Sequence, residues 1–489
     1  MNYRYEEIFS DIKDALERGT ILPLEKLPSL RKSARKYGCA ISVVIQAYNR
    51  LEGLGLISSV EKSGFIVNRK SAVPMPNPEM AEHTLIPNMT TVNLMTSEIV
   101  DRAMDKTILP FGAAIPDASL IASRKLAGYI SRSGKNRAEL FSMYTASYGS
   151  ENLRKEIAKF MFKRGVSAGL KDIVITNGCS EALYISLKIL TSPGDTVAIE
   201  SPTYFSLISI LEELKIKVLE IPTRADSGLD MEGLTRAVEG REIKALVFSS
   251  TFQNPLCSIM DGASLKRLHA LSLKYGFTLI EDDIYGDCSF DGKVYQPLKA
   301  LDKENRVIYC SSFSKTISPG IRIGWALPGI NTDRFREVKQ ISCLGGPAIL
   351  QEALADYLAD GCYEAHIKSF RKKIYQQTYK IRALIEEFFP EGIKVTRPQG
   401  GFFLWVEFPE GFDSLKLYRM AYENRIGIVP GPVFSVIENY VNAVRISCGA
   451  EVTEEIVEGI RKLGELAKSM LSVPMGHFSS ASRLQTVMT

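Results

Sequence analysis

Hydrophobic and polar positions follow two different periods along the chain and divide it into two units. In the first seventy residues the apolar positions have a helical spacing, with Ile8, Ile12 and Leu16 on one face of a predicted helix over residues 5–19. From about Leu109 onward, short apolar runs alternate with longer amphipathic stretches. This order is typical of an α/β unit with a mostly parallel sheet and helices on both faces.

The N-terminal pattern predicts a small helical unit that ends in a hairpin. Helix, short glycine turn, helix and hairpin is the layout of a winged helix-turn-helix domain. We therefore predict a DNA-binding domain over residues 1–70. Its expected elements after the first helix are a helix from the N-cap Ser29 to Gly38, a helix over residues 40–53, and a hairpin of residues 56–60 and 64–67.

The rest of the chain is expected to divide as follows. Residues 71–108 lose periodicity and carry closely spaced prolines at 74, 76 and 78, which predicts an extended linker. The α/β domain is predicted over residues 109–470, with a large part at about 109–340 and a smaller α+β part at about 341–470. Residues 333–365 and 366–389 are predicted to be helical. Residues 471–489 are rich in Ser and Met and are expected to form a flexible tail.

Charge is placed unevenly along the chain. Residues 1–70 hold 12 Lys and Arg against 8 Asp and Glu, so the whole net charge of +4 lies there. Such an excess fits a DNA-binding surface and an ordinary solvated surface about equally well. Apolar residues make up 45% of the chain and charged residues 24%, which predicts a large globular protein.

Location and metal content are also constrained. No apolar run approaches the roughly 20 residues of a membrane span, and the N-terminus lacks the layout of a signal peptide. We expect a cytoplasmic protein without membrane association. The eight cysteines form no C-x-x-C pair and are interpreted as reduced thiols. The four histidines are isolated, so no metal site is predicted.

A lysine just beyond a strand end carries the most informative chemistry. The apolar run 307–310 leads into Ser312, Ser314 and Lys315, with Arg322 seven positions further on. Serine hydroxyls and an arginine suit a phosphate, and a lysine beside it can form a Schiff base with a carbonyl cofactor. Pyridoxal phosphate (PLP) carries both groups. Taken alone, the stretch is also compatible with a strand, a Ser-rich turn and a solvated lysine.

Four other predicted strand ends carry residues that suit the same ligand. A helix start offers backbone N–H groups to a phosphate, an aromatic ring can stack on a flat cofactor, an amide can bond a ring hydroxyl, and a buried carboxylate can pair with a protonated pyridine. Because open α/β sheets bind ligands at their strand ends, the five turns are expected to converge. The residues are Gly178, Cys179 and Ser180, then Tyr204, then Asn254, then Asp282 and Tyr285.

The N-terminal unit resembles the GntR-type winged DNA-binding domain. The likeness rests on Leu27-Pro28-Ser29-x-Arg31, Ala47-Tyr48-x-x-Leu51-Glu52-x-x-Gly55-Leu56-Ile57 and Ser63-Gly64-Phe65-Ile66-Val67. Such domains usually carry Ser-Arg and then Thr where this chain has Ala40, Ile41 and Val43, which removes one expected contact. The resemblance implies double-stranded DNA as a partner, and the candidate contacts are Arg31, Lys32, Ser42, Gln46 and Arg50.

The larger unit resembles the class I/II aminotransferases of PLP fold type I. The likeness rests on Asn254-Pro255, Asp282-x-x-Tyr285, Ser312-x-Ser314-Lys315, Gly320-x-Arg322-x-Gly324-Trp325, Tyr144-x-x-x-x-Gly149 and Pro202-x-Tyr204. The family usually continues Asn-Pro with Thr-Gly, whereas this chain has Leu256-Cys257.

The resemblance implies PLP as the cofactor and gives each site residue a role. It makes Lys315 the covalent attachment point, puts Asp282 on the pyridine nitrogen, stacks Tyr204 on the ring, and places Asn254 and Tyr285 near the phenolic oxygen. The phosphate is assigned to Gly178–Ser180, Ser312, Ser314 and Arg322. Tyr144 is expected to reach the phosphate of a partner subunit, which implies a homodimer. Arg445, an arginine within an apolar strand, is expected to bind a substrate or effector carboxylate, with a structural salt bridge as the alternative.

Together, the two resemblances identify the chain as similar to the MocR subfamily of GntR regulators. We predict a PLP-binding transcriptional regulator that senses an amine or amino acid, or PLP itself, through Schiff-base chemistry at Lys315. The alternative is a working aminotransferase with a degenerate winged-helix module, which the departure at Ala40 and Ile41 favours slightly. The intact set of cofactor residues does not discriminate between these two hypotheses, because both need PLP.

Overall fold

The fold was analysed in a computed structural model of the 489-residue chain. It describes residues 4–17, 21, 25–53, 56–60, 64–67, 75–81, 85–89 and 94–471. The predicted tail beyond residue 471 and the first residues of the predicted linker lie outside these ranges. None of the helices that the structure describes combines the length and the apolar composition needed to cross a membrane.

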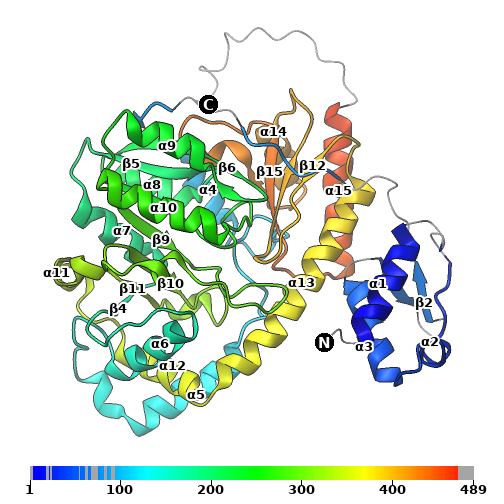
Figure 1. The fold of residues 1–489 in the computed structure, drawn as a ribbon, viewed down its shortest axis with the longest axis horizontal. Helices are drawn as coiled ribbons and strands as arrows, with labels where there is room; N and C mark the ends of the chain where they lie inside the picture. Colours follow the sequence, from blue (N-terminus) through cyan, green and yellow to red (C-terminus); the bar gives the residue numbers. More distant parts are fainter. Residues whose placement is uncertain are drawn as a thin grey trace.

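The N-terminal unit has the predicted arrangement of helices and hairpin (Figure 1). Ser29 caps the second helix, because its hydroxyl accepts a hydrogen bond from the backbone N–H of Lys32. The small core is closed by Tyr48, which is fully buried and donates its hydroxyl proton to the carbonyl of Pro28. The elements are α1 (Arg4–Glu17), α2 (Leu30–Lys36), α3 (Ile41–Gly53), β1 (Ile57–Val60) and β2 (Gly64–Val67), with β1 and β2 antiparallel.

The segment after this unit packs against the rest of the molecule where it is described. Pro76 accepts a backbone hydrogen bond from Val395, and β3 (Asn88–Met89) pairs antiparallel with β6 (Lys217–Arg224). Helix α4 (Leu94–Arg102) then lies against α14 (Ser414–Glu423).

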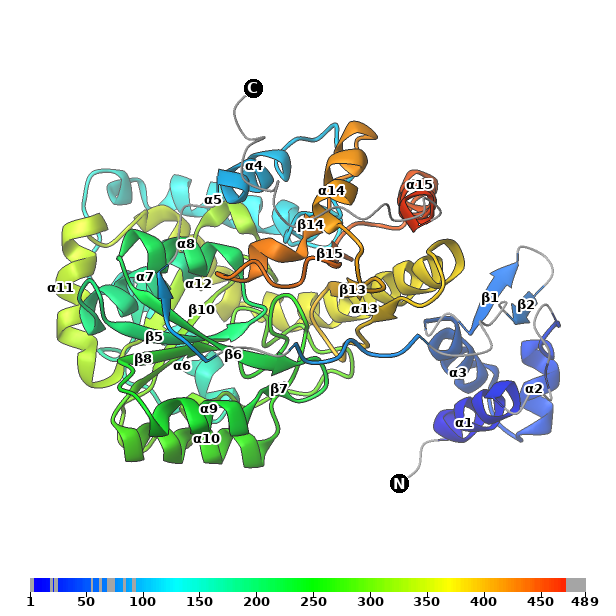
Figure 2. The same ribbon diagram turned by 90° about the horizontal axis from the view of Figure 1, so that it is seen from above.

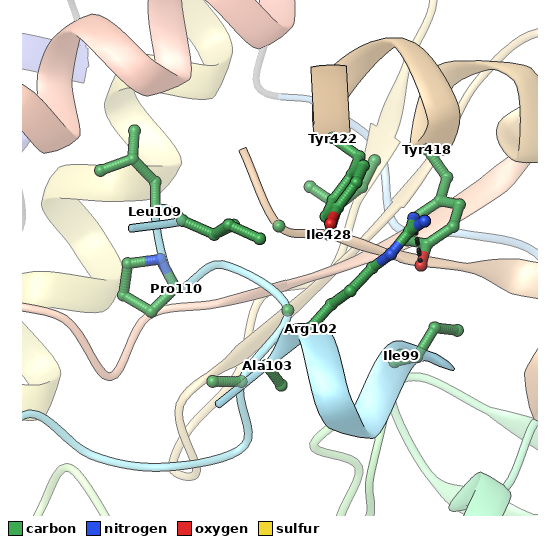
Figure 3. Close-up of a pocket in the computed structure, with 12 residues that line it drawn as sticks. Ile99, Arg102, Ala103, Leu109, Pro110, Tyr418, Tyr422 and Ile428 are labelled. Carbon is green, nitrogen blue, oxygen red and sulfur yellow. Dashed lines mark hydrogen bonds between the residues drawn. The ribbon is translucent and has the colours of Figure 1, made fainter. Parts of the chain in front are cut away.

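Arg102 fixes α4 to α14. Its guanidinium carbon lies 3.4 Å from the centre of the Tyr422 ring and 5.3 Å from that of Tyr418, whose hydroxyl accepts a hydrogen bond from it at 3.0 Å. These residues border a small cavity of about 20 Å³ (Figure 3). Cation–π stacking on two rings stabilises this contact, so the chain leading to the α/β domain is anchored on its C-terminal part.

A mostly parallel sheet forms the centre of the large domain. Within the described residues it has nine strands in the order β3-β6-β5-β8-β9-β10-β11-β4, with β7 paired to β6. Strands β6, β5, β8, β9 and β10 are parallel, and β11 is antiparallel to both of its neighbours. Its further strands are β4 (Val174–Thr176), β5 (Thr196–Ser201), β7 (Gly228–Leu229), β8 (Ala245–Phe248), β9 (Thr278–Asp282), β10 (Ile308–Ser312) and β11 (Gly324–Leu327).

Helices cover both faces of this sheet, as the alternating sequence pattern predicts. Figure 2 shows α9 and α10 on one side and α7 and α8 on the other. Each layer has its own buried apolar cluster, since neighbouring strand residues point to opposite faces. The helices of this part are α5 (Ser123–Asn136), α6 (Glu151–Lys163), α7 (Cys179–Leu190), α8 (Phe205–Glu213), α9 (Met231–Glu239) and α10 (Gly262–Tyr275).

The helical stretch after the lysine differs from the prediction. Three helices replace the two expected over residues 333–365 and 366–389: α11 (Thr332–Cys343), α12 (Ala348–Ala359) and α13 (Cys362–Phe388). Gly345, Gly346 and Pro347 interrupt the first predicted helix, and Gly361 has a φ of +67° before α13. Both breaks follow from glycine and proline chemistry.

The C-terminal part packs a four-stranded antiparallel sheet against helices. Its strand order is β12-β13-β15-β14, and α15 packs against α13 and α14. This small sheet brings Arg445, on β15, toward the strand ends of the large sheet. The elements are β12 (Lys394–Val395), β13 (Phe403–Glu407), β14 (Val429–Pro430), β15 (Ala443–Ser447) and α15 (Glu454–Leu471).

Helix α13 joins distant parts of the molecule. Its first turns reach the residue that follows Lys315: Tyr363 donates a hydrogen bond to the Thr316 hydroxyl at 3.4 Å, and the His366 ring nitrogen lies 2.6 Å from the Thr316 carbonyl. Further along, α13 contacts α3 of the N-terminal unit, as Figure 2 shows. The same helix therefore touches both predicted functional regions.

Candidate cofactor and effector site

Lys315 lies just past the end of β10, inside the molecule. Its Nζ donates a hydrogen bond to the Ala114 carbonyl at 2.7 Å and lies 5.8 Å from the centre of the Tyr285 ring. Burial, followed by the charge of Arg445, lowers the pKa of the Lys315 amine to about 8, and Asp282 opposes this shift. A lysine with such a pKa carries a substantial fraction of neutral amine near pH 7–8, which is the nucleophilic form.

Asp282 ends β9 and faces the N-terminus of α7. Its Oδ1 accepts hydrogen bonds from the Cys179 thiol at 3.3 Å and from the Ile284 N–H at 3.2 Å. Burial raises the pKa of Asp282 to about 6, so its charge lacks a strong partner.

The neighbouring Asp283 points to the other side of β9. It pairs with Arg164 and accepts a hydrogen bond from the Tyr309 hydroxyl at 2.8 Å. This carboxylate is therefore committed to a structural network, and Asp282 is the one that faces the predicted cofactor position.

The predicted phosphate residues lie together around Arg322. The Arg322 guanidinium donates to the Asn177 carbonyl at 3.1 Å and lies 3.4 Å from the Ser314 hydroxyl, which is 2.7 Å from that of Ser312. Ser180 is exposed on the first turn of α7. Gly178, Cys179 and Ser180 thus bring the helix N-terminus to the same place as Arg322, and together they form a ready anion site.

Two glycines make this close approach possible. Gly178 has a φ of +84°, and a Cβ there would overlap Nη2 of Arg322. A Cβ on Gly324 would lie 2.6 Å from the backbone of Gly178 and 2.7 Å from the Ser311 carbonyl oxygen. Side chains at either position would separate β11 from the turn before α7 and break up the anion site.

Arg445 is fully buried between the two sheets. It donates to the Asn254 side chain at 3.0 Å and to the Gly112 carbonyl at 2.6 Å, while its Nε has no hydrogen-bond partner. Burial lowers its pKa to about 10. Among the residues that the structure describes, no carboxylate lies within ion-pair distance of Arg445, so a structural salt bridge is not formed there. A buried arginine whose charge no protein carboxylate balances favours an anionic ligand.

Two tyrosines flank the same space. Burial raises the pKa of Tyr285 and of Tyr204, and the charges of Arg445 and Asp282 act on both hydroxyls. The Tyr285 ring packs edge-on against Phe402 and Phe403. Both hydroxyls are therefore close enough to Arg445 and Asp282 for the two charges to act on their pKa values.

Tyr144 does not join this group within the chain. Its side chain is 87% exposed, as are large parts of its neighbours Phe141 and Met143. Its expected place at the phosphate of a partner subunit remains a prediction.

Sequence reasoning missed two backbone acceptors and one unusual turn. The backbone carbonyls of Gly112 and Ala114 accept hydrogen bonds from Arg445 and Lys315, respectively. Because every residue has a backbone carbonyl, the residue types at these positions give no indication of this role. Cys257 stands where the related family usually has glycine and adopts a φ of +55°. Its thiol is buried near the Phe403 carbonyl at 3.7 Å. The turn therefore keeps a left-handed backbone at Cys257, although cysteine, unlike glycine, carries a side chain.

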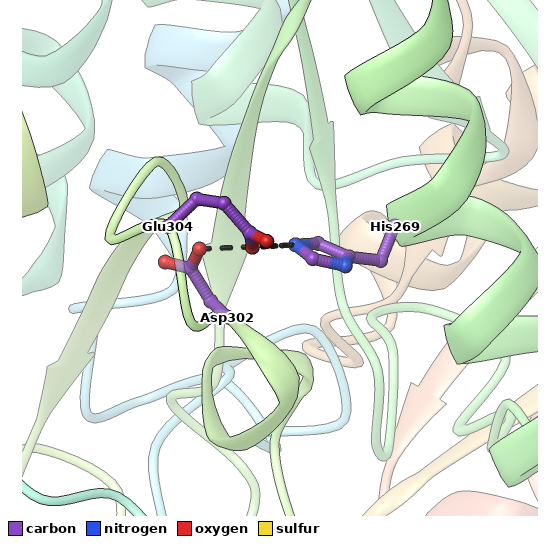
Figure 4. A group of neighbouring side chains, drawn as sticks. All are labelled: His269, Asp302 and Glu304. Atoms are coloured by element: carbon purple, nitrogen blue, oxygen red, sulfur yellow. Dashed lines mark ion pairs between the residues drawn. The ribbon is translucent and has the colours of Figure 1, made fainter.

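One group of possible metal ligands lies elsewhere, on the α10 side of the sheet. His269, Asp302 and Glu304 place their ligand atoms within 4.8 Å of one another (Figure 4). Asp302 accepts hydrogen bonds from the Lys299 ammonium at 2.8 Å and from the Val307 N–H at 2.8 Å. Because an ammonium already neutralises this carboxylate, the group is best described as an ion-pair network.

All five predicted DNA contacts are exposed: Arg31, Lys32, Ser42, Gln46 and Arg50. Arg50 also has contacts within the domain, because it stacks on Phe9 at 4.3 Å and lies 3.9 Å from Glu6. The departure from the related domains leaves the apolar side chain of Ile41 exposed on α3, and Ile45 on the same helix is exposed as well.

Comparison with known protein families agrees with the structure of both the N-terminal unit and the larger domain. Residues 123–462 match the aminotransferase class I and II family, and residues 4–67 match the gntR family of bacterial regulatory proteins. The chain belongs to the regulators that join these two domains. Family membership confirms the predicted fold class, the winged-helix DNA-binding domain and pyridoxal phosphate as the cofactor.

Two relatives share this whole architecture. The chain is 33% identical to the HTH-type transcriptional regulator YjiR of Escherichia coli K12 over 94% of this chain and 98% of that protein. It is 30% identical to YdcR of the same organism, covering 96% and 100%. Both carry the name of HTH-type transcriptional regulators, which supports the regulatory prediction.

Solved structures resemble the larger domain. The kynurenine aminotransferase of Pyrococcus horikoshii superposes with a TM-score of 0.73 at 30% identity, covering 78% of this chain and 96% of that one. The α-aminoadipate aminotransferase LysN of Thermus thermophilus gives 0.71 at 25% identity, covering 78% and 99%. These two structures are described as complexes with PMP and with a phosphopyridoxyl-leucine adduct, respectively.

Proposed function

We propose that this regulator senses a carboxylated amine, such as an amino acid, at Lys315 and alters its DNA binding in response. The observation that carries the proposal is Arg445. It is fully buried, keeps an unpartnered Nε, and has no carboxylate partner in the described part of the chain. An arginine without a protein anion beside a low-pKa lysine favours a ligand with both a carboxylate and an amine.

The residues around Lys315 fit the cofactor. Pyridoxal phosphate supplies an electrophilic carbonyl carbon and an electron-accepting ring. Lys315 would attach it covalently, Asp282 would hold the proton on its ring nitrogen, and Tyr204 would stack on the ring. Asn254 and Tyr285 would flank the ring hydroxyl. The phosphate would be held by Gly178, Cys179, Ser180, Ser312, Ser314 and Arg322.

This arrangement explains how an amino compound can be detected. Its carboxylate would bind Arg445, and its amine would compete with the Lys315 amine for the cofactor carbonyl. A displaced Lys315 would present a free amine in a pocket that disfavours its charged form. Ligand binding would therefore change the environment of the side chain next to Thr316, which α13 contacts.

Helix α13 is the proposed route to the DNA-binding domain. From Tyr363 to Tyr375 it extends about 18 Å at 1.5 Å per residue. Tyr375 lies close enough to Arg50 of α3 for the guanidinium charge to lower the Tyr375 pKa, against the larger raising effect of burial. A ligand can change DNA binding through this helix only if it binds more tightly to one arrangement of α13 and the DNA-binding domain than to another.

We propose a homodimer in the cytoplasm as the functional form. Phe141, Met143 and Tyr144 form a continuous exposed stretch with 70%, 57% and 87% of their surface accessible. A second copy covering this stretch would bury apolar surface and place Tyr144 at the partner's phosphate site.

DNA binding and its response to ligands test the proposal. DNA from upstream of the chain's own gene should bind with an affinity that falls steeply with salt. A panel of amino acids added to the PLP-loaded protein should change that affinity for at least one member, with no change in the Lys315→Ala protein. Salt-independent binding, or a response that survives in Lys315→Ala, contradicts the proposal.

Catalytic transamination is the second candidate. Lys315, Asp282 and Arg445 are all present, and the domain is 30% identical to a kynurenine aminotransferase. Keto-acid release over many turnovers with a panel of amino donors would support this function. Formation of one equivalent of adduct without turnover would favour the sensor.

A further inference from the structure

Two packed helices of the N-terminal domain present different chemistry to solvent. Helix α2 carries four exposed basic side chains, at Arg31, Lys32, Arg35 and Lys36. Helix α3 packs against α2, and its residues 41–49 include no Lys, Arg, Asp or Glu. Charge is therefore concentrated on α2, and the first turns of α3 are uncharged.

The solvent-facing side of α3 combines apolar and amide side chains. The opposite side is buried in the core of the domain through Val44, Ala47, Tyr48 and Leu51. With 3.6 residues per turn, the exposed residues between these positions share one side of the helix. We call this side the outer face of α3, and it consists of Ile41, Ser42, Ile45, Gln46 and Asn49.

The two isoleucines of the outer face are accessible although the whole chain surrounds the domain. Ile41 is 42% exposed and Ile45 is 39% exposed. Neither side chain is part of the apolar core that the described residues of the domain form. They lie one helical turn apart and beside two amides, so the outer face suits a surface that offers methyl groups and hydrogen-bonding edges together.

The major groove of an A·T base pair offers this combination. Adenine presents an acceptor and a donor that Asn and Gln bind in bidentate fashion, and thymine presents its methyl group to apolar side chains. Guanine is most often recognised by Arg or Lys, and the outer face carries neither. The chemistry of α3 therefore favours A·T over G·C pairs.

The basic residues of α2 indicate that the surface facing α3 is a nucleic acid. Lys and Arg neutralise phosphates whatever the base sequence. In helix-turn-helix proteins the second helix enters the major groove, and the helix before it contacts the backbone. An α2 with four cations and an α3 with an uncharged outer face match this division of contacts.

On the basis of the DNA-dependent function proposed above, we propose that the outer face of α3 reads A·T base pairs, with Ile41 and Ile45 packed on thymine methyl groups. Gln46 and Asn49 bind adenines of the same or neighbouring pairs, and Ser42 hydrogen-bonds either base. The cations of α2 hold the flanking phosphates. The departure at Ile41 thus exchanges a charged contact for an apolar one that depends on sequence.

Uracil tests the methyl contact directly, because it pairs as thymine does but lacks the methyl group. DNA from upstream of the chain's own gene would be amplified with either dTTP or dUTP. Mobility shifts with the full-length, PLP-loaded protein would then compare the two DNAs. Burying one methyl group is worth about fourfold in affinity, so losing two or more should weaken binding by at least about tenfold.

A double variant assigns the uracil effect to the isoleucines. Ile41→Ala/Ile45→Ala should bind thymine DNA about tenfold more weakly than the parent and should bind both DNAs equally. Ile86→Ala removes an exposed isoleucine outside the domain and should keep the full difference. Ile41→Arg should bind both DNAs more tightly through its charge, yet discriminate between them less than the parent does.

Selection from a randomised duplex pool tests the amide contacts. The parent should enrich sites in which A·T pairs predominate. Gln46→Ala and Asn49→Ala should each lose the preference at one position and leave the dependence of affinity on salt unchanged, because neither removes a phosphate contact. Enrichment of G·C pairs by the parent would contradict A·T reading.

The outcomes distinguish this reading from the function on which it rests. If the parent binds thymine DNA and uracil DNA equally, the methyl contact is wrong and the proposed function stands. A uracil penalty that persists in the double variant would assign the effect to DNA shape and also overturn the contact. A parent that does not bind thymine DNA would contradict the proposed function, and methyl reading with it. If the double variant loses its thermal transition, Ile45→Ala alone decides by the same comparison.

Discussion

The cofactor pocket and the DNA-binding domain organise their charged residues in opposite ways. In the pocket, Arg445 is buried and Lys315 and Asp282 are half-buried, and burial shifts the pKa of each away from its ordinary value. In the N-terminal domain, Arg31 and Lys32 are exposed to solvent. Pocket charges that form no ion pair with another described residue indicate what kind of ligand the site would bind, whereas exposed charges act only when DNA is bound.

This contrast has an energetic consequence. A pocket residue acts in a low-dielectric site where one lost partner costs several kcal/mol. A surface residue that contacts a phosphate is worth less, and its contribution varies with salt. We therefore expect near-complete losses in the pocket and graded losses on the DNA-binding surface.

The largest effect is expected from Lys315→Ala. Removing the amine should abolish the yellow absorbance of the bound cofactor, because no covalent link can form, while the fold stays intact. Absorbance spectra and thermal unfolding of both proteins test this. Lys380→Ala removes an exposed lysine of α13 as the matched control and should keep the colour. A yellow band retained in Lys315→Ala would refute the assignment of the lysine.

Gly178→Ala should be the next most damaging change. Its Cβ would displace the Arg322 guanidinium and weaken cofactor binding by about 100-fold, the loss of one or two charge-assisted hydrogen bonds. Gly194→Ala is the matched control, since its φ of +91° imposes the same backbone strain but its Cβ would meet no atom within 4 Å. Equal cofactor affinity in the two variants would show that crowding at Arg322 is unimportant. Equilibrium dialysis against PLP measures the difference.

Arg445→Gln separates effector binding from cofactor binding. We expect the affinity for a responding amino acid to fall by roughly 10- to 100-fold, because a charged partner of its carboxylate is lost. The decarboxylated amine should bind both proteins about equally, and PLP affinity should change little. Spectral titrations of the holoproteins provide the measurement. A loss shared equally by amino acid and amine would assign Arg445 a purely structural role.

The pH dependence of cofactor attachment should change more modestly. Attachment requires the neutral amine, so the rate of PLP incorporation into the apoprotein should rise with pH through about 8 and then level off. Arg445→Gln removes a charge that lowers the Lys315 pKa and should move the midpoint upward. Asp282→Asn removes a charge that raises the Lys315 pKa and should move the midpoint downward. Comparing the three profiles cancels the titration of the cofactor itself, and three coincident midpoints would contradict this electrostatic account.

The smallest effects are expected on the DNA-binding face. Lys32→Ala should weaken binding by several-fold on all sequences and reduce the slope of log affinity against log salt by about one. Ile41→Arg restores a charge at the position where related domains carry one, and should strengthen binding. Electrophoretic mobility shifts over a salt series measure both. Unchanged salt slopes in both variants would place the DNA contact on another surface.

The sequence predicted the side chains of the pocket better than the backbone groups that hold them in place. Strand ends rich in Ser, Asn and Asp indicated Lys315, Asp282 and Asn254, because function there depends on residue type. The Gly112 and Ala114 carbonyls depend on where a loop passes, which residue type does not record. Helix lengths were overestimated at residues 333–365, because amphipathic spacing continues across a Gly-Gly-Pro break.

The coupling elements were the hardest to foresee. Nothing in the composition of α13 indicates that it reaches Thr316 at one end and α3 further along. The predicted extended linker likewise gives no hint of the anchor that Arg102 makes on Tyr422. Such contacts arise from tertiary packing between segments that are far apart in the sequence, from 50 residues for Thr316 and His366 to 316 for Arg102 and Tyr418, so local patterns do not encode them.

The attachment of the cofactor tests the central claim most directly. Borohydride reduction of the purified PLP-loaded protein, followed by proteolysis and mass spectrometry, locates the covalent link on one lysine. Our account predicts that the pyridoxyl group is found on Lys315 and nowhere else, in a protein that is yellow before reduction. A colourless protein that ignores added pyridoxal phosphate, or a label on any other lysine, would contradict it.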